Sequence, residues 1–140
     1  MKRCLWLVGV IVVLVGLMTS CNAGGQDGPV VRAVLFYSPT CPHCHQVMEE
    51  DLPPLQRKYG RQLQILEMDT STREGQELFY AALDHFQIDS AGVPLMVVGD
   101  IVLRGSREIP EYLPTMIEYG LQEGGVDWPE IPGFEPPPGV

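Results

Sequence analysis

The chain has 140 residues, of which 45% are apolar, and this length suits one compact domain rather than two. Its formal net charge is −9, whereas a protein that binds nucleic acid or an anionic membrane surface needs a basic face. The composition therefore argues against nucleic acid as a partner and favours an acidic, well-solvated surface.

The first twenty residues have the features of a signal segment. Lys2 and Arg3 give it a positive start, and the stretch from Leu5 to Met18 is an almost unbroken apolar run. That run is shorter than the ~20 residues a spanning helix needs, and it fits the apolar region of a secretory signal. Small residues then precede Cys21 in a pattern that resembles the bacterial lipoprotein signal, in which this cysteine becomes lipid-modified.

We expect residues 1–20 to be a lipoprotein-type signal peptide and residues 21–29 to hold the lipid attachment at Cys21 and a flexible tether. An uncleaved anchor and ordinary secretion are the alternatives. All three place the domain outside the cytoplasm, and the favoured one anchors it to the membrane through its N-terminus. With the signal removed and Cys21 capped by lipid, Cys41 and Cys44 remain as a single pair in an oxidising compartment.

The next stretch predicts a strand followed by a broken helix. Val30 to Tyr37 is a nearly continuous apolar run of β-branched and aromatic residues, which indicates a buried strand. A helix is expected from about Cys41 to Leu52. The two prolines that follow should kink or break it before a second helical piece over residues 55–59, which Gly60 ends.

A second strand and a second helix come next. Leu63 to Met68 is the predicted strand. Ser71, with Glu74 three residues later, forms a capping-box signature that opens a helix. That helix carries apolar side chains at helical spacing as far as Phe86.

A β-hairpin and a last helix complete the domain. Two apolar runs, at residues 95–98 and 101–103, are joined by Gly-Asp, which is typical of a tight hairpin turn. The last helix is expected over residues 111–121, after Pro110 and with Pro114 in its first turn. The order β-α-β-α-β-β-α predicts an α/β fold with a four-stranded mixed sheet and helices on both faces.

These elements place the domain at residues 30–121 and leave residues 122–140 as a tail rich in proline and glycine. We expect this tail to be extended and partly disordered. Trp128 within it either docks a partner or folds back onto the domain, and the sequence does not decide between the two.

The motif Cys41-Pro42-His43-Cys44 directly follows the first strand, at the start of a helix. Backbone N–H groups and the positive end of the helix dipole at such a place stabilise the thiolate of Cys41, which is the reactive form. Cys44 lies one turn further on and can resolve a mixed disulfide by attacking the sulfur of Cys41. Pro42 begins the helix without wasting a backbone donor. His43 is expected to tune the sulfur rather than to act as an acid–base catalyst.

The segment from Phe36 to Cys44 resembles the active site of the thioredoxin superfamily, and its inner Pro-His pair is the one found in DsbA-type dithiol oxidases. The tripeptide at residues 92–94 resembles the superfamily's cis-proline loop. This resemblance implies a thioredoxin-like fold and a cis bond before Pro94. It further implies that Pro94 packs against the active-site disulfide and that the backbone of Val93 binds the substrate chain.

The resemblance also implies a function. We expect a minimal thioredoxin or glutaredoxin-like domain, similar to those associated with vitamin K epoxide reductase-like membrane proteins, that needs no cofactor. Cys41 and Cys44 would form its redox disulfide, and protein thiols and disulfides would be its substrates. A membrane redox partner, vitamin K epoxide reductase-like or DsbB-like, would recharge it. Because a stabilised thiolate makes the disulfide more oxidising, oxidase or isomerase work is favoured over reductase work.

Two alternatives stay open. Strands of this superfamily often carry a buried acid six residues before the first cysteine, where this chain has Leu35. Glu67 could replace it by pointing inward, although a solvated edge position is favoured. The second hypothesis is a copper- or metal-handling lipoprotein on the same scaffold. Metal sites need three or four converging ligands, and His85 is distant from the motif, so we predict no metal site. His45 is expected on the helix surface.

Overall fold

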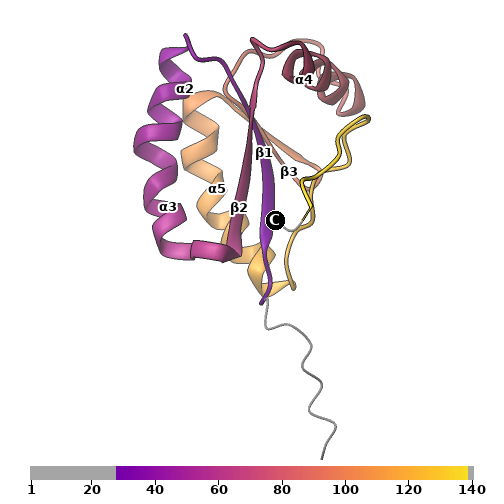
Figure 1. The fold of residues 1–140 in the computed structure, drawn as a ribbon. Coiled ribbons are helices and arrows are strands. Elements are labelled where there is room, and N and C mark those ends of the chain that lie inside the picture. The colour runs from indigo at the N-terminus through magenta and orange to yellow at the C-terminus, as the bar shows by residue number, and fades with distance from the viewer. Residues whose placement is uncertain (1–27, 139–140) are drawn as a thin grey trace, which may run out of the picture.

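A computed structural model describes residues 28–138, so the predicted signal peptide, Cys21 and most of the tether lie outside the described residues. The structure has a four-stranded mixed sheet in the order β2-β1-β3-β4 (Figure 1). The strands are β1 (Val31–Tyr37), β2 (Leu63–Asp69), β3 (Leu95–Val98) and β4 (Ile101–Arg104). β1 pairs in parallel with β2 and antiparallel with β3, which confirms the predicted mixed sheet. Between residues 28 and 138 no helix has the length and apolar character to cross a membrane.

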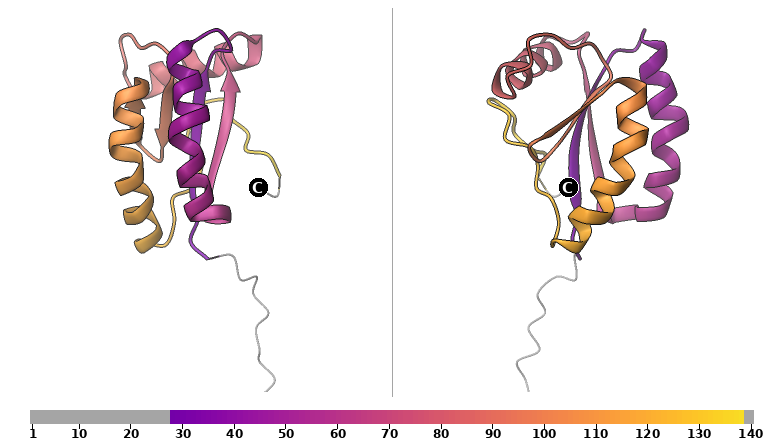
Figure 2. Two further views of the ribbon diagram at one scale, coloured as in Figure 1. Left: turned by 90° about the vertical axis from the view of Figure 1, so that its left-hand side faces the viewer. Right: turned by 180° about the vertical axis from the view of Figure 1, so that it is seen from behind.

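Four α-helices in the described part of the chain cover this sheet: α2 (Pro42–Gln46), α3 (Leu52–Tyr59), α4 (Arg73–His85) and α5 (Gly105–Gln122). α4 lies against one face, and the other three lie against the opposite face (Figure 2). Side chains that alternate along β1 separate two cores. Leu35 belongs to the core beneath α3 and α5, whereas Phe36 points the other way and meets Phe79 of α4, with ring centroids 5.5 Å apart.

The helix after β1 continues through the place where the sequence predicts a kink or a break. A π-helical stretch, Val47–Asp51, joins α2 to α3, and the N–H of Leu52 donates to the carbonyl of Val47, five residues back. Residues 53–54 are prolines, which have no N–H to donate and whose rings clash with a carbonyl four residues back. The wider turn moves those carbonyls away, so the chain remains helical. Gly60, with φ +53, ends it as predicted.

α4 begins at a different cap from the predicted one. Thr72, rather than Ser71, is the N-cap: its hydroxyl oxygen accepts a hydrogen bond from the N–H of Gly75 at 3.1 Å and donates to the carbonyl of Asp69 at 2.7 Å. Gly75 is required by the same close turn, because a Cβ there would collide with the carbonyl oxygen of Asp69.

We therefore expect Gly75→Ala to lower the free energy of unfolding by about 1–3 kcal/mol, the usual cost of overpacking, despite the better helix propensity of alanine. Urea denaturation measures this difference. Gly92→Ala is the matched control, because a Cβ at Gly92 meets nothing within 4 Å. Equal stability of the two variants would show that α4 is not held against Asp69 in this way.

The hairpin forms as predicted, with Gly99 at the first position of its turn and φ +56. α5, in contrast, begins at Gly105 and includes both Pro110 and Pro114, whereas the sequence predicts a start at residue 111. The N–H of Arg104, just before α5, donates to the carboxylate of Glu108 at 2.8 Å, which satisfies one donor at the helix start.

The physical reason for this longer helix lies in burial. Ile109, Leu113 and Ile117 are fully buried on the sheet-facing side of α5, and Leu103 of β4 belongs to the same core. The burial of these side chains offsets the hydrogen bonds that the two prolines cannot make. Proline alone is therefore a poor guide to where this helix begins.

The sequence predicts an extended and partly disordered tail at residues 122–140, whereas the described part of the chain beyond α5 packs on the domain. The described part of it returns across the sheet, on the side of α4 (Figure 1). Val126 forms a parallel bridge with Val31. In this bridge the N–H of Arg32 donates to the carbonyl of Val126 at 2.9 Å, and the N–H of Val126 donates to the carbonyl of Val30 at 2.8 Å.

Apolar side chains then fix this segment to the second core. Ile131 is only 4% exposed. Trp128 and Phe134 pack against the same core and meet each other edge to face, with ring centroids 5.9 Å apart. Of the two alternatives for Trp128, the structure shows the side chain folded back onto the domain.

Candidate functional site

The cysteine motif lies at the carboxyl end of β1, where the chain turns into α2. Cys41 is the N-cap of α2, with an extended backbone of φ −93 and ψ 113, and Pro42 is the first helical residue. The carbonyl of Cys41 accepts hydrogen bonds from the N–H groups of Cys44 and His45, at 3.1 and 3.2 Å. The motif therefore occupies the predicted place directly after a buried strand.

Cys41 and Cys44 are both free thiols, and the two residues approach each other to 2.7 Å. The sulfur of Cys41 accepts a hydrogen bond from the N–H of Cys44 at 3.2 Å. Its thiol is also placed to donate to the carbonyl of Val93 at 3.5 Å. Cys44 is only 1% exposed, whereas Cys41 is half-buried, so a reagent from solvent reaches Cys41 first.

Burial raises the pKa of the Cys44 thiol to about 12, from an ordinary value of 9.0. The hydrogen bond with Cys41 and the charge of that residue act in the same direction, while a backbone contact with Ser38 opposes them. Cys44 is therefore a thiol, and not a thiolate, at neutral pH.

We expect iodoacetamide at pH 8 to alkylate Cys41 and to leave Cys44 unmodified in the folded chain, as peptide mass spectrometry would show. Because the folded pKa of Cys44 is raised, its contribution to stability is present below about pH 9 and is lost as the pH rises towards 12. Cys44→Ser, which lacks this thiol, should lose less stability over that interval. Equal labelling of both cysteines at pH 8 would contradict the burial of Cys44.

The loop before β3 brings the second motif to the first. The bond between Val93 and Pro94 is cis, as predicted. Val93 contacts Cys41 through its carbonyl, although 52 positions separate the two residues in the sequence. The carbonyl of Pro94 accepts a hydrogen bond from the N–H of Gly105 at 2.8 Å, which ties this loop to the start of α5.

Ser106 is a neighbour of the motif that sequence reasoning missed. Its hydroxyl lies 3.2 Å from Nδ1 of His43, whose side chain is exposed at the start of α2. No local pattern pointed to this contact, because the predicted last helix began five residues further on. Contact between α2 and α5 thus supplies the partner of His43.

His45 lies on the exposed surface of α2, where it was predicted. Its Nε2 lies 2.8 Å from the carbonyl oxygen of Pro39, and its Nδ1 lies 3.0 Å from the carboxylate of Glu49. The hydrogen bond to Glu49, and secondly that to Pro39, raises the pKa of His45 above its ordinary value of 6.5. Both ring nitrogens are therefore engaged.

A cavity of about 350 Å³ lies beside the buried sulfur, between the end of β1, the edge strand β2 and the helix that follows the motif. Cys44, His45, Glu49 and Glu67 are among its lining residues. Glu67 pairs with Leu35 in the register of β2 and β1. It is exposed, as the favoured edge position predicts.

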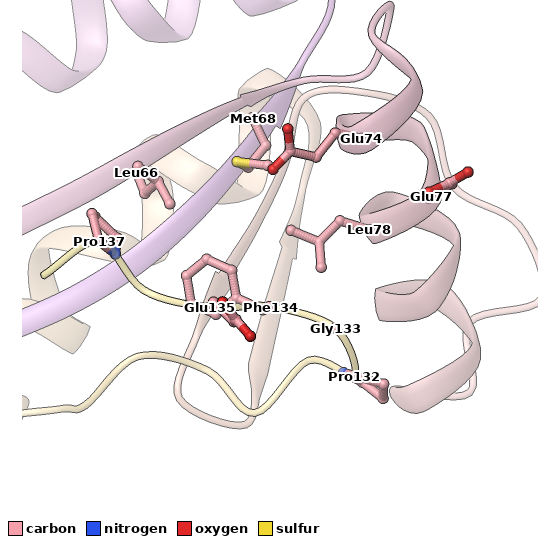
Figure 3. A pocket seen from close by; sticks show the side chains of 10 residues that line it. All are labelled: Leu66, Met68, Glu74, Glu77, Leu78, Pro132, Gly133, Phe134, Glu135 and Pro137. Carbon is pink, nitrogen blue, oxygen red and sulfur yellow. The ribbon is translucent and has the colours of Figure 1, made fainter.

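A larger cavity of about 490 Å³ lies on the face of the sheet that α4 covers, as Figure 3 shows. Its walls come from β2, α4 and the C-terminal segment, with Met68 and Leu78 among the apolar side chains and Glu74 and Glu135 among the acidic ones. Among the described residues that line this cavity there is no cysteine or histidine. Cys44 lines the smaller cavity instead.

No group of three or more His, Cys, Asp or Glu side chains in the described residues could hold a metal ion. The described residues therefore offer no cluster of ligands in support of the metal-handling hypothesis. Neither a scan against protein-family models nor a search of the curated proteins finds a match for this chain.

Proposed function

We propose that the chain is a thioredoxin-like thiol–disulfide oxidoreductase that acts on protein substrates, with oxidase or isomerase work favoured over reductase work. The observation that carries this proposal is the arrangement of Cys41 and Cys44. One sulfur lies towards the surface and accepts a backbone hydrogen bond, and the second lies buried beside it. A helix directly after the central strand and a hairpin after the cis peptide support the thioredoxin-like fold.

The chemistry in the oxidase direction starts from a Cys41–Cys44 disulfide. A client thiolate attacks the sulfur of Cys41, and the bond between the two cysteines breaks. Cys44 leaves as a thiolate and takes up a proton. A second client thiolate then attacks the client sulfur of the mixed disulfide, and Cys41 leaves as a thiolate. The client loses two electrons and the protein gains them.

Sequence features support a location and a partner for this activity. A signal-like segment at residues 1–20 followed by Cys21 supports a lipoprotein held outside the cytoplasm. After each turnover the reduced pair must return two electrons to an oxidant. We propose a membrane redox partner, vitamin K epoxide reductase-like or DsbB-like, for that step.

Equilibration of the full chain in glutathione buffers of graded potential tests the proposal. After acid quenching and alkylation, mass spectrometry gives the fraction of protein in the disulfide form. We expect one two-electron transition between the dithiol and a Cys41–Cys44 disulfide. A midpoint well above about −270 mV, the value for thioredoxin, supports the oxidase direction, and one near it supports a reductase. A chain that forms no such disulfide under any of these conditions contradicts the function itself.

A further inference from the structure

The larger cavity, on the face of the sheet that α4 covers, is lined by none of the residues of the cysteine motif. Its volume of about 490 Å³ falls within the range of roughly 300–1,000 Å³ that ligand sites have. Leu66 and Met68 of β2 and Leu78 of α4 give it apolar walls (Figure 3). A ligand that fills this cavity therefore needs an apolar part.

Acidic side chains lie at the rim of these apolar walls. Glu74 points into the cavity from the first turn of α4, and Glu135 lines it from the C-terminal segment (Figure 3). The third acid, Glu77, binds Arg73 at 2.8 Å. No Lys or Arg is among the described residues that line the cavity. The rim therefore carries negative charge, and a ligand that matches it is positively charged.

An arginine side chain combines the two properties that the cavity requires. Its methylene stem packs on apolar surface while its charged head stays at a polar rim. A guanidinium group also binds carboxylates with two parallel hydrogen bonds and stacks on aromatic rings. Phe134 supplies such a ring in the lining of the same cavity. Arginine therefore fits the cavity better than a purely apolar side chain does.

The strand that forms one wall of the cavity has an open edge. β2 lies at the end of the sheet order, and in the described chain it pairs only with β1. The backbone N–H and C=O groups on the outer side of this seven-residue strand therefore have no strand partner between residues 28 and 138. Native proteins usually shorten, cover or charge such an edge, because it can pair with another chain.

A strand added to this edge would have its side chains on alternate faces of the sheet. Those on the α4 face lie next to Leu66 and Met68, and so beside the cavity. Those between them lie on the opposite face, where Glu67 lines the cavity beside Cys44. In this mode of binding the paired backbones supply affinity, and the cavity for alternate side chains supplies specificity.

We propose that the outer edge of β2 and the larger cavity together form a docking site for an extended segment of a partner protein. The segment pairs with β2 as a fifth strand of the sheet. It inserts an arginine stem among the apolar walls and places the guanidinium group at the rim beside Glu74 and Glu135. No thiol takes part in this contact, so the inference goes beyond the proposed function and does not depend on it.

Fluorescence anisotropy with labelled synthetic peptides and the full chain tests this docking site. The probe is the cysteine-free heptapeptide Thr-Val-Thr-Arg-Thr-Val-Thr, whose arginine shares one face of the strand with two valines. One control peptide has citrulline, which is uncharged and of similar shape, in place of the arginine. The other is N-methylated at its three central residues, which removes backbone donors on both edges. We expect each control to bind at least about tenfold more weakly than the probe, because each lacks hydrogen bonds that the site makes.

Variants of the chain locate the binding. The double variant Glu74→Gln with Glu135→Gln removes both rim charges, and it should weaken binding of the probe by about fivefold or more, because each ion pair of this kind contributes a few-fold. Glu50→Gln with Glu130→Gln is the matched control: it removes two exposed carboxylates that do not line the cavity, and it should bind the probe like wild type. In the complex, amide protons of β2 should exchange more slowly with solvent.

Several results would overturn the proposal. The arginine has no role if the citrulline peptide binds as tightly as the probe, and the rim is not the site if both double variants lose affinity equally. Equal binding of the N-methylated peptide would place an isolated cation in the cavity and reject the added strand. A dimer of the peptide-free chain in which β2 is protected from exchange would assign the edge to a second copy. Absence of saturable binding up to about 1 mM probe would reject the site altogether.

Discussion

Cys41→Ser is expected to lower the rates of insulin reduction and of peptide dithiol oxidation to the background level. The reason is that it removes the sulfur that substrates in solution can reach. Cys44→Ser should keep the attacking sulfur but lose the one that resolves the mixed disulfide. It should therefore accumulate disulfide-linked complexes with client proteins. Non-reducing electrophoresis would show these complexes, and a reductant should cleave them into their separate chains.

Cys21→Ser is the matched control, because it removes a cysteine outside the motif. We expect this variant to retain wild-type exchange activity in a purified preparation. If Cys41→Ser and Cys44→Ser both retained full activity, the pair could not be the redox centre. If Cys41→Ser, and not Cys44→Ser, accumulated disulfide-linked complexes, the two sulfurs would have the opposite roles.

The second large effect concerns stability and comes from the C-terminal segment. Ile131→Ala should lower the free energy of unfolding by about 2–4 kcal/mol, because it leaves a cavity in the core beneath α4. The side chain is 4% exposed and packs with that core, which also contains Phe36 and Phe79. Urea denaturation of the full chain, monitored by circular dichroism, measures the change.

Ile101→Ala provides the matched control, because the same atoms are removed from a side chain that is 53% exposed. We expect that variant to lose much less stability, since little apolar surface returns to water. If Ile131→Ala were no more harmful than Ile101→Ala, the segment after α5 would be a loose tail, as the sequence suggests.

Local signals in the sequence were sufficient for the elements that position the site. The apolar run that ends at Tyr37 predicted β1, and the Gly-Asp pair predicted the hairpin turn. The cis bond before Pro94 followed from a resemblance to a known loop, and the structure has it. The places of Cys41 and Cys44 directly after β1, at the start of α2, were predictable for the same reason, since they depend on neighbours only a few positions away.

The elements that sequence reasoning missed depend on contacts between distant residues. Proline rules predicted a kink or a break in the first helix and a late start of α5. The first helix instead adapts by a wider turn, and α5 is held by the burial of side chains such as Ile109. The contact between His43 and Ser106 requires α5 to begin before Pro110. The burial of Ile131 was missed as well, because the segment around it is rich in proline and glycine.

The direction of β1 decides which end of the molecule is available for partners. The strand runs from Val31 to Tyr37, over seven residues at about 3.3 Å each, so roughly 20 Å separates its first residue from its last. Cys41 follows the far end of the strand. Anything attached to the chain before residue 28 is therefore joined near the first residue of β1. Cys41 lies beyond the last residue of that strand, at the end away from the attachment.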